Sequence, residues 1–336
     1  MDFGYYFVTS STGALCNLTT TAPIAEINDK NDVPFIKTAD KTTADIGEIV
    51  QYELTGKVPD TTGFNTFTYL ITDNMSAGLT FRDDVVLTIS GAAVDAAKYE
   101  IKKVGNGFEL RIFVMQLKDK AGQEIKVKYS AVINEAAVAV ISRNTAVLKY
   151  SNDPTNENST NENSTTEITV VKKVYSAKIV INKYETGSEA KKLAGAKFVL
   201  KNSEDKYYKY VPAQSDEAAR ADWIDTKEGA TEVTTDSNGA ATFEGLKDGT
   251  YKLEETCAPT GYNLLTEDVT VEINGAAATD TNLTTLTATA DIANSKGTML
   301  PATGGIGTTL FYVFGSIMVL GAAIFVVVKK RMSLTK

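Results

Sequence analysis

The stretch Ile179-Val180-Ile181-Asn182-Lys183 begins with three β-branched apolar residues, which favour a β-strand, and ends on a lysine. Successive residues of a β-strand point to opposite sides, so residues two apart share a face. Lys183 shares the face of Ile179 and Ile181 and is therefore predicted to point into a core. A lone buried charge costs several kcal/mol, so the lysine needs a partner there.

Two other strand-like segments place polar groups on their apolar faces. In Tyr251-Lys-Leu-Glu-Glu255 the last glutamate has the parity of the tyrosine and the leucine, and in Ile292-Ala-Asn294 the asparagine has the parity of the isoleucine. We expect Lys183, Glu255 and Asn294 to meet inside one domain, because buried charges are paired or neutralised. The competing interpretation is a partly exposed Lys-Glu ion pair, with Asn294 capping a turn.

An earlier part of the chain, from about Asn31 to Asn152, shows the same pattern. Three polar residues continue the parity of an apolar run: Lys37 after Val33 and Phe35, Asp73 after Phe67, Tyr69 and Ile71, and Asn152 after Ala146, Leu148 and Tyr150. We predict that Lys37, Asp73 and Asn152 converge in a second core. Lys41 and Asn144 keep the same parities and remain the alternatives for the lysine and the asparagine.

Many short alternating segments separated by turn residues predict an all-β chain of tandem sandwiches. The pentapeptide Asn156-Glu-Asn-Ser-Thr160 is repeated at once as residues 161–165, and this polar, low-complexity repeat predicts a linker. The expected domains are a remnant of a truncated β-domain at 1–30, a sandwich at 31–153, a polar linker at 154–170, a second sandwich at 171–296 and a C-terminal signal at 297–336.

The second sandwich resembles a known family. Tyr251-Lys-Leu-Glu-Glu-Thr-Cys-Ala-Pro-Thr-Gly-Tyr262 is similar to the E-box of Cna B-type domains of Gram-positive pilins and adhesins, and Leu193-Ala-Gly-Ala-Lys-Phe198 is similar to the segment that follows their reactive lysine. The resemblance implies an immunoglobulin-like sandwich in which Lys183 and Asn294 condense to an isopeptide bond while Glu255 assists. Cys257 departs from the family pattern, in which a lysine is more usual.

The first sandwich resembles the fimbrial isopeptide-forming domain of Cna A type. The similarity rests on Ile71-Thr-Asp-Asn-Met-Ser-Ala-Gly-Leu-Thr-Phe81 and on Asn144-Thr-Ala-Val-Leu-Lys-Tyr-Ser-Asn-Asp-Pro154. In that family the assisting acid is an aspartate. The resemblance therefore implies a bond between Lys37 and Asn152 with Asp73 as the acid, and it leaves Lys41 and Asn144 as the competing choices.

The C-terminus combines Leu300-Pro301-Ala302-Thr303-Gly304, an apolar stretch at 308–328 and the basic cluster Lys329-Lys330-Arg331. About 20 apolar residues can cross a bilayer as a helix, and basic residues keep the following end in the cytoplasm. This order resembles the cell-wall sorting signal of Gram-positive surface proteins. It implies a single-pass membrane stage, cleavage by sortase between Thr303 and Gly304, and transfer of the threonine to peptidoglycan or to a neighbouring pilin subunit.

Composition excludes several classes of function. The chain has 336 residues, no histidine and a net charge of −8. The lack of histidine removes Ser-His-Asp hydrolysis and nearly every zinc site, and the acidic balance argues against nucleic acid as a partner. We expect no cofactor and no metal. The only chemistry in view is single-turnover and self-directed, so the chain is not expected to be an enzyme.

The N-terminus lacks the charged start and apolar run of a signal peptide, which an exported protein needs. We therefore interpret the chain as a fragment or a mis-started gene product, the alternative being an intact leaderless protein. The pilin motif Tyr-Pro-Lys-Asn is absent, and Lys30 in Asn28-Asp-Lys-Asn-Asp32 is a weak candidate for the linking lysine.

The favoured hypothesis is a secreted, cell wall-anchored structural pilin subunit stiffened by isopeptide bonds. The alternative is a wall-anchored adhesin, whose site for a host surface ligand would lie in the missing N-terminal region.

Overall fold

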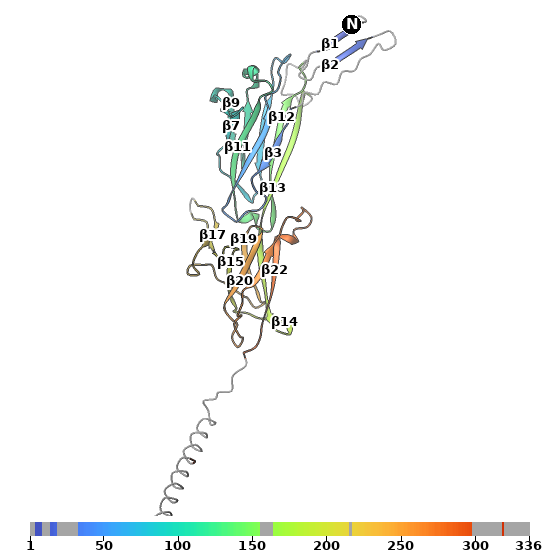
Figure 1. The fold of residues 1–336 in the computed structure, drawn as a ribbon. Coiled ribbons are helices and arrows are strands. Elements are labelled where there is room, and N and C mark those ends of the chain that lie inside the picture. The colour runs from blue at the N-terminus through green and yellow to red at the C-terminus, as the bar shows by residue number, and fades with distance from the viewer. Residues whose placement is uncertain are drawn as a thin grey trace, which may run out of the picture.

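The computed structural model describes residues 4–8, 14–18, 33–154, 164–214, 217–297 and 318. It contains two β-sandwiches stacked end to end, as Figure 1 shows, together with an antiparallel hairpin of β1 (Gly4–Val8) and β2 (Ala14–Leu18). The all-β prediction is thus confirmed. Within the described part of the chain no helix is long and apolar enough to cross a bilayer. The span predicted at 308–328, apart from Met318, lies outside these residues, as do Lys30 and the motif at 300–304.

The first sandwich packs two sheets face to face. One sheet has the order β13-β12-β5-β10-β9, and the other has the order β3-β4-β11-β7-β8 with β6 also paired to β11. The strands are β3 (Ile36–Ala39), β4 (Ile49–Lys57), β5 (Tyr69–Met75), β6 (Leu79–Phe81), β7 (Val86–Ile89), β8 (Ala92–Ala93), β9 (Tyr99–Lys103), β10 (Gly107–Ile112), β11 (Glu124–Ile133), β12 (Val140–Ser151) and β13 (Thr165–Glu185).

The second sandwich has the same two-layer plan. In one layer β13 pairs with β14, β19 and β22, and the other layer has the order β17-β16-β15-β20-β21 with β18 on β15. Its remaining strands are β14 (Ser188–Lys192), β15 (Lys197–Lys201), β16 (Tyr207–Val211), β17 (Arg220–Ile224), β18 (Val233–Thr234), β19 (Ala240–Leu246), β20 (Gly249–Cys257), β21 (Val269–Ile273) and β22 (Thr287–Asn294).

Five short 3₁₀ turns complete the described secondary structure. They are η1 (Ala96–Lys98), η2 (Val114–Gln116), η3 (Lys118–Lys120), η4 (Glu135–Ala137) and η6 (Thr284–Leu286).

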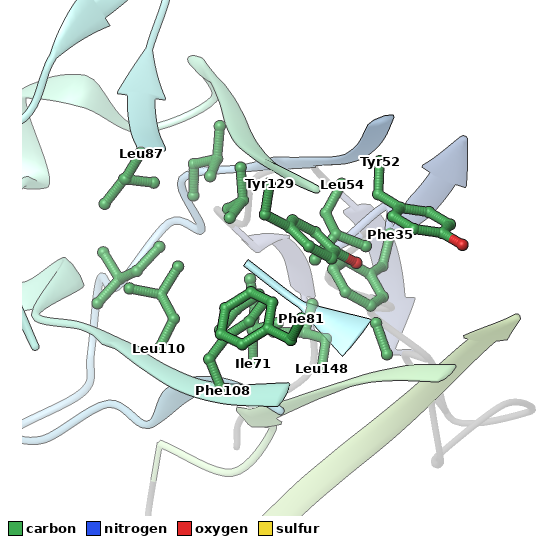
Figure 2. Packing of buried hydrophobic residues seen from close by; sticks show 14 of the residues in the cluster. Phe35, Tyr52, Leu54, Ile71, Phe81, Leu87, Phe108, Leu110, Tyr129 and Leu148 are labelled. Carbon is green, nitrogen blue, oxygen red and sulfur yellow. The ribbon is translucent and has the colours of Figure 1, made fainter. Parts of the chain in front are cut away.

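The core of the first sandwich is aromatic at one end (Figure 2). Tyr129 stacks on Tyr52 with ring centroids 5.6 Å apart and meets Phe108 edge-on at 4.9 Å. Ile71 and Leu148 come from the opposite sheet and are almost fully buried. Along these strands, apolar residues that point inward alternate with polar residues that point outward. Two sheets with this pattern bury their apolar faces by packing against each other, which gives the two-layer structure.

A single strand, β13, belongs to both sandwiches (Figure 1). Its first half pairs with β12 from Thr165 to Ser176, and its second half pairs with β19 and β22 from Ala177 onward. The linker predicted at 154–170 is therefore shorter than expected, because Thr165–Val170 is strand. Ile168 and Val170 pack against the first core, which fixes this segment in the sheet.

The loop between β3 and β4 docks on the second sandwich. Asp45 is almost fully buried; its carboxylate accepts hydrogen bonds from Trp223 Nε1 at 3.0 Å and from the backbone N–H of Lys247 at 2.8 Å. Gly47 has φ +87° and a Cβ there would lie 2.3 Å from that of Arg220, so only glycine fits this approach. The two domains are held together by specific contacts in addition to the shared strand.

A loop of the second sandwich also contacts the first sandwich at their joint. The Asp280 carboxylate forms ion pairs with Arg143 and with Lys173, whose Nζ lies 3.0 Å from Asp280 Oδ1. Both cations belong to the first sandwich. A small apolar cluster of Ile141, Tyr175 and Leu286 lies at the same joint.

Candidate isopeptide sites

The site in the second sandwich draws on three strands. Lys183 lies on β13, Glu255 on β20 and Asn294 at the end of β22. Strands β13 and β22 are parallel neighbours, with Lys183 in register with Ile292, so the lysine and the asparagine leave adjacent strands toward the same core. All three residues are buried, at 0 %, 5 % and 1 % exposure respectively. The structure therefore brings together the three residues that parity predicted.

The polar atoms of this site form a closed set. Lys183 Nζ donates to Asn294 Oδ1 and lies 3.3 Å from Glu255 Oε1. Asn294 Nδ2 donates to both carboxylate oxygens of Glu255 at 3.0 Å and to the carbonyl of Asn263 at 2.9 Å. The backbone N–H of Leu265 donates to Glu255 Oε2 at 2.9 Å. The acid is thus fixed against the amide nitrogen, and the amine against the amide oxygen.

Burial controls the charge of this lysine. Desolvation lowers the pKa of Lys183 below its ordinary value, opposed by the nearby Glu255 carboxylate. A lower pKa increases the population of the neutral amine, which is the nucleophilic form. The geometry is therefore suited to attack of an amine on an amide carbonyl with an acid at the leaving nitrogen.

The first sandwich holds a similar pair. Lys37 on β3 donates from Nζ to Asp73 Oδ2 on β5 at 2.7 Å, and both side chains are fully buried. Burial lowers the pKa of Lys37 to about 8, and it raises the pKa of Asp73. The two pKa values move toward each other, so the neutral amine becomes accessible near neutrality. Lys41, the alternative lysine, is a third exposed and pairs with Glu48 at 3.2 Å.

Of the two candidate asparagines, Asn144 and not Asn152 is connected to Asp73 by the described contacts. Asn152 lies past the end of β12, is exposed, and donates to Thr166 Oγ1 at 2.8 Å. Asn144 is fully buried on β12, where it is in register with Met75 of the strand that carries Asp73. Both asparagines have the inward parity, but only Asn144 lies within the sheet, so the structure does not bring Asn152 to the Lys37–Asp73 pair.

Tyr129 on β11 connects the acid to this asparagine. Its hydroxyl donates to Asp73 Oδ2 at 2.6 Å and accepts from Asn144 Nδ2 at 3.3 Å. Among the described residues, Asp73 Oδ1 and Asn144 Oδ1 have no hydrogen-bond partner. The sequence did not single out Tyr129, because an inward hydroxyl leaves no trace in a hydrophobic pattern. The part that Asn263 plays in the other site could not be predicted from side-chain patterns either, because it contributes its backbone carbonyl.

No cluster of His, Cys, Asp and Glu suited to a metal ion occurs in the part of the chain that the structure describes.

Comparison with known proteins defines the class. Residues 46–163 match the model of a Gram-positive pilin backbone subunit 2, Cna-B-like domain; residues 177–287 match a prealbumin-like fold domain of the SpaA family; and residues 293–333 match the LPXTG cell wall anchor motif. The first sandwich, likened to the Cna A type from its sequence, thus matches a model described as Cna-B-like. Successive segments of the chain are thus similar to a Gram-positive pilin backbone domain, to a prealbumin-like fold domain and to the LPXTG cell wall anchor motif.

Individual relatives agree with this class. The trypsin-resistant surface T6 protein of Streptococcus pyogenes serotype M6 is 26 % identical over 386 residues, covering 88 % of this chain and 67 % of the relative. The pilus 2b backbone protein of group B streptococcus is 28 % identical, with a TM-score of 0.59 over 79 % of this chain and 99 % of the other.

A more distant structure has the same fold. The full-length major pilin RrgB of Streptococcus pneumoniae is 17 % identical, with a TM-score of 0.61 over 87 % and 80 % of the two chains. The match of residues 293–333 to the LPXTG cell wall anchor motif supports a wall-anchored surface protein.

Proposed function

We propose that this chain is a pilin backbone subunit that ties each of its two sandwiches with a self-formed Lys–Asn isopeptide bond, Lys37–Asn144 in the first and Lys183–Asn294 in the second. Asp73 and Glu255 assist. The observation that carries the proposal is the contact of the Lys183 amine with Asn294 Oδ1, next to Glu255, in a fully buried site. A buried lysine, acid and amide in contact are costly as separate groups, whereas an amide bond removes the amine charge altogether.

The reaction balances without any external reagent. Neutral Lys183 Nζ attacks the side-chain carbonyl carbon of Asn294, the new C–N bond forms, and the bond to Nδ2 breaks. The proton lost by the lysine nitrogen reaches Nδ2 through Glu255, which contacts both nitrogens, and ammonia leaves. Holding the reacting groups together replaces the usual need for an enzyme.

The bond in the second sandwich would change how the chain carries tension. The chain enters this domain along β13 and leaves it along β22, and Lys183 and Asn294 are 111 residues apart in sequence. A covalent link between them passes a pull directly from one strand to its neighbour. The intervening strands are then spared, which suits a protein that bears load outside the cell.

Assembly would follow from the C-terminal motif. The resemblance to sorting signals supports transfer of the Thr303 carbonyl to an amine, either on peptidoglycan or on a neighbouring subunit, after a stage in which the apolar stretch at 308–328 holds the precursor in the membrane. Lys30 is the proposed acceptor lysine.

Intact mass spectrometry tests the bonds directly. We expect the purified chain to weigh less than its sequence mass by two ammonia molecules, and tandem spectra to contain linked peptides with Lys37 joined to Asn144 and Lys183 joined to Asn294. Asn152→Ala is the matched control, and it should leave both mass losses in place. An intact mass equal to the sequence mass would eliminate the proposal.

A further inference from the structure

The two sites differ in how the acid reaches the amide. In the second sandwich Asn294 Nδ2 donates directly to Glu255 at 3.0 Å. In the first sandwich Asn144 Nδ2 donates to the Tyr129 hydroxyl, and that hydroxyl donates to Asp73. Aspartate is one methylene shorter than glutamate, so a hydroxyl placed between the acid and the amide makes up for the shorter reach.

We propose that Tyr129 is a catalytic residue of the first-domain reaction, in which its hydroxyl carries a proton from Asp73 to the departing amide nitrogen of Asn144. This inference rests on the proposed function, since it assigns a role within the Lys37–Asn144 condensation. Three contacts form a continuous path, Lys37 Nζ to Asp73 Oδ2 at 2.7 Å, Asp73 Oδ2 to Tyr129 Oη at 2.6 Å, and Tyr129 Oη to Asn144 Nδ2 at 3.3 Å.

The proton balance closes along this path. When the Lys37 amine is neutral, Asp73 holds the proton of the pair. Attack on the Asn144 carbonyl carbon makes Nδ2 tetrahedral and frees its lone pair, so the hydrogen bond with Tyr129 reverses direction. Tyr129 then gives its proton to Nδ2 and takes one from Asp73, and the Asp73 carboxylate takes the surplus proton of the new amide nitrogen. Ammonia leaves, and Tyr129 and Asp73 return to their starting states.

The surroundings of Tyr129 suit a neutral donor held in place. Its ring stacks on Tyr52 and meets Phe108 edge-on, which fixes the direction of the hydroxyl (Figure 2). Burial, reinforced by the Asp73 charge, raises the pKa of Tyr129 well above its ordinary value, so the hydroxyl keeps its proton at rest. It can relay a proton without ionising first.

Tyr52 provides a control within the same aromatic stack. Its hydroxyl is buried and has no hydrogen-bond partner among the described residues, while its ring packs against the ring of Tyr129. Tyr52→Phe and Tyr129→Phe therefore remove the same atom from neighbouring rings, and only the second removes an atom of the proton path.

The test is a time course of bond formation during cell-free synthesis of the full chain, followed by intact mass and by the linked Lys37–Asn144 peptide. We expect Tyr129→Phe to slow this bond about 10²-fold, the lower end of general acid–base effects, and Tyr52→Phe to leave the rate unchanged. The Lys183–Asn294 bond of the same molecules serves as the internal standard for synthesis and folding.

A second variant keeps the test decisive if Tyr129→Phe fails to fold. Fluorotyrosine introduced at position 129 retains the ring and hydroxyl but has a more acidic proton, so the first-domain rate should differ from that of the wild-type chain while the second-domain rate stays the same. A wild-type rate in Tyr129→Phe, or in the fluorotyrosine chain, would overturn the role of Tyr129. Absence of the Lys37–Asn144 link from the wild-type chain would instead refute the proposed bond itself.

Discussion

Lys183 and Asn294 lie on parallel neighbouring strands, with the amine of one against the amide oxygen of the other. The chain enters this domain along β13 and leaves it along β22, and the two strands run in the same direction. A link between Lys183 and Asn294 therefore joins the first strand of the domain to its last. The acid that accompanies them, Glu255, comes from the opposite sheet. The site therefore also connects the two layers of the sandwich.

Loss of the second-domain bond should lower stability strongly. A cross-link that closes a loop of about 100 residues stabilises by on the order of 4 kcal/mol through the unfolded chain, by analogy with disulfides. We expect Asn294→Ala to lower the melting temperature of the second sandwich by roughly 15 °C in scanning calorimetry. Asn152→Ala should melt with the wild-type chain. A melting point that is unchanged in Asn294→Ala would contradict the presence of the bond.

Removing the acid without changing its shape should stop the second-domain reaction. Glu255→Gln keeps the side-chain volume but cannot exchange protons at this site. The variant should therefore fold but lose only one ammonia, from the first domain, whereas the wild-type chain loses two. Glu254→Gln changes the neighbouring residue, which pairs with Lys227 at 2.6 Å on the outer face, and serves as the control. Equal mass losses in the two variants would show that Glu255 is dispensable.

The unreacted first domain should become more stable at alkaline pH. The folded pKa of Lys37 is about 8, below the ordinary 10.5, so between these values the unfolded chain binds more protons and stability rises with pH. In Asn144→Ala, which cannot react, we expect a gain on the order of 1 kcal/mol between pH 8 and about pH 9.5, below the range in which the raised pKa values of Tyr52, Tyr69 and Tyr129 make stability fall, measured by denaturant unfolding. Lys37→Met/Asn144→Ala, which lacks the titrating amine, should lack this rise; if it rises equally, Lys37 is not the group responsible.

The joint between the sandwiches should loosen when Asp45 is changed. Asp45→Ala leaves the Trp223 indole N–H and the Lys247 backbone N–H without their acceptor, which we expect to cost about 2 kcal/mol and to increase bending between the domains. Small-angle X-ray scattering and Trp223 fluorescence would measure the change. Asp225→Ala, at an exposed side chain of the same sandwich, should leave both signals unaltered.

The formation of covalent polymers distinguishes the shaft-pilin hypothesis from the adhesin hypothesis. We expect wall extracts to give a ladder of covalent polymers on denaturing gels, and Thr303→Ala to abolish both the ladder and wall attachment. Lys30→Ala should abolish the ladder but keep a single wall-linked band. A single band from the wild-type chain would favour the adhesin alternative, and a ladder that survives Lys30→Ala would move the acceptor to another lysine.

Strand parity was sufficient for much of the fold and for most of the candidate site residues. It placed Lys183, Glu255 and Asn294 on inward faces because the period of two fixes which side of a sheet a residue occupies. It could not choose between Asn144 and Asn152, which have equal parity, because that choice depends on where β12 stops pairing with β5. Parity likewise gave no reason to single out the hydroxyl of Tyr129 from other core aromatics.

The residue at which the second sandwich begins could not be predicted from a local sequence pattern either. The repeat at 156–165 looks like the end of a module, yet Thr165–Val170 continues directly into the strand that both domains use. Periodicity reports that a segment is extended, but it does not report which sheet the segment joins. In the second sandwich β13 pairs with β19 and β22, which are distant from it in sequence.

Since β13 completes both sandwiches, the modules of this protein cannot be exchanged as independent cassettes. In a chimera joined at residue 171, the second half of the segment that pairs with β12 would come from a foreign sequence. The foreign residues would have to pair with β12 and place apolar side chains toward the core of the first sandwich. Recombination between related pilins should therefore succeed only when a crossover falls outside this strand or replaces it together with the partners on either side.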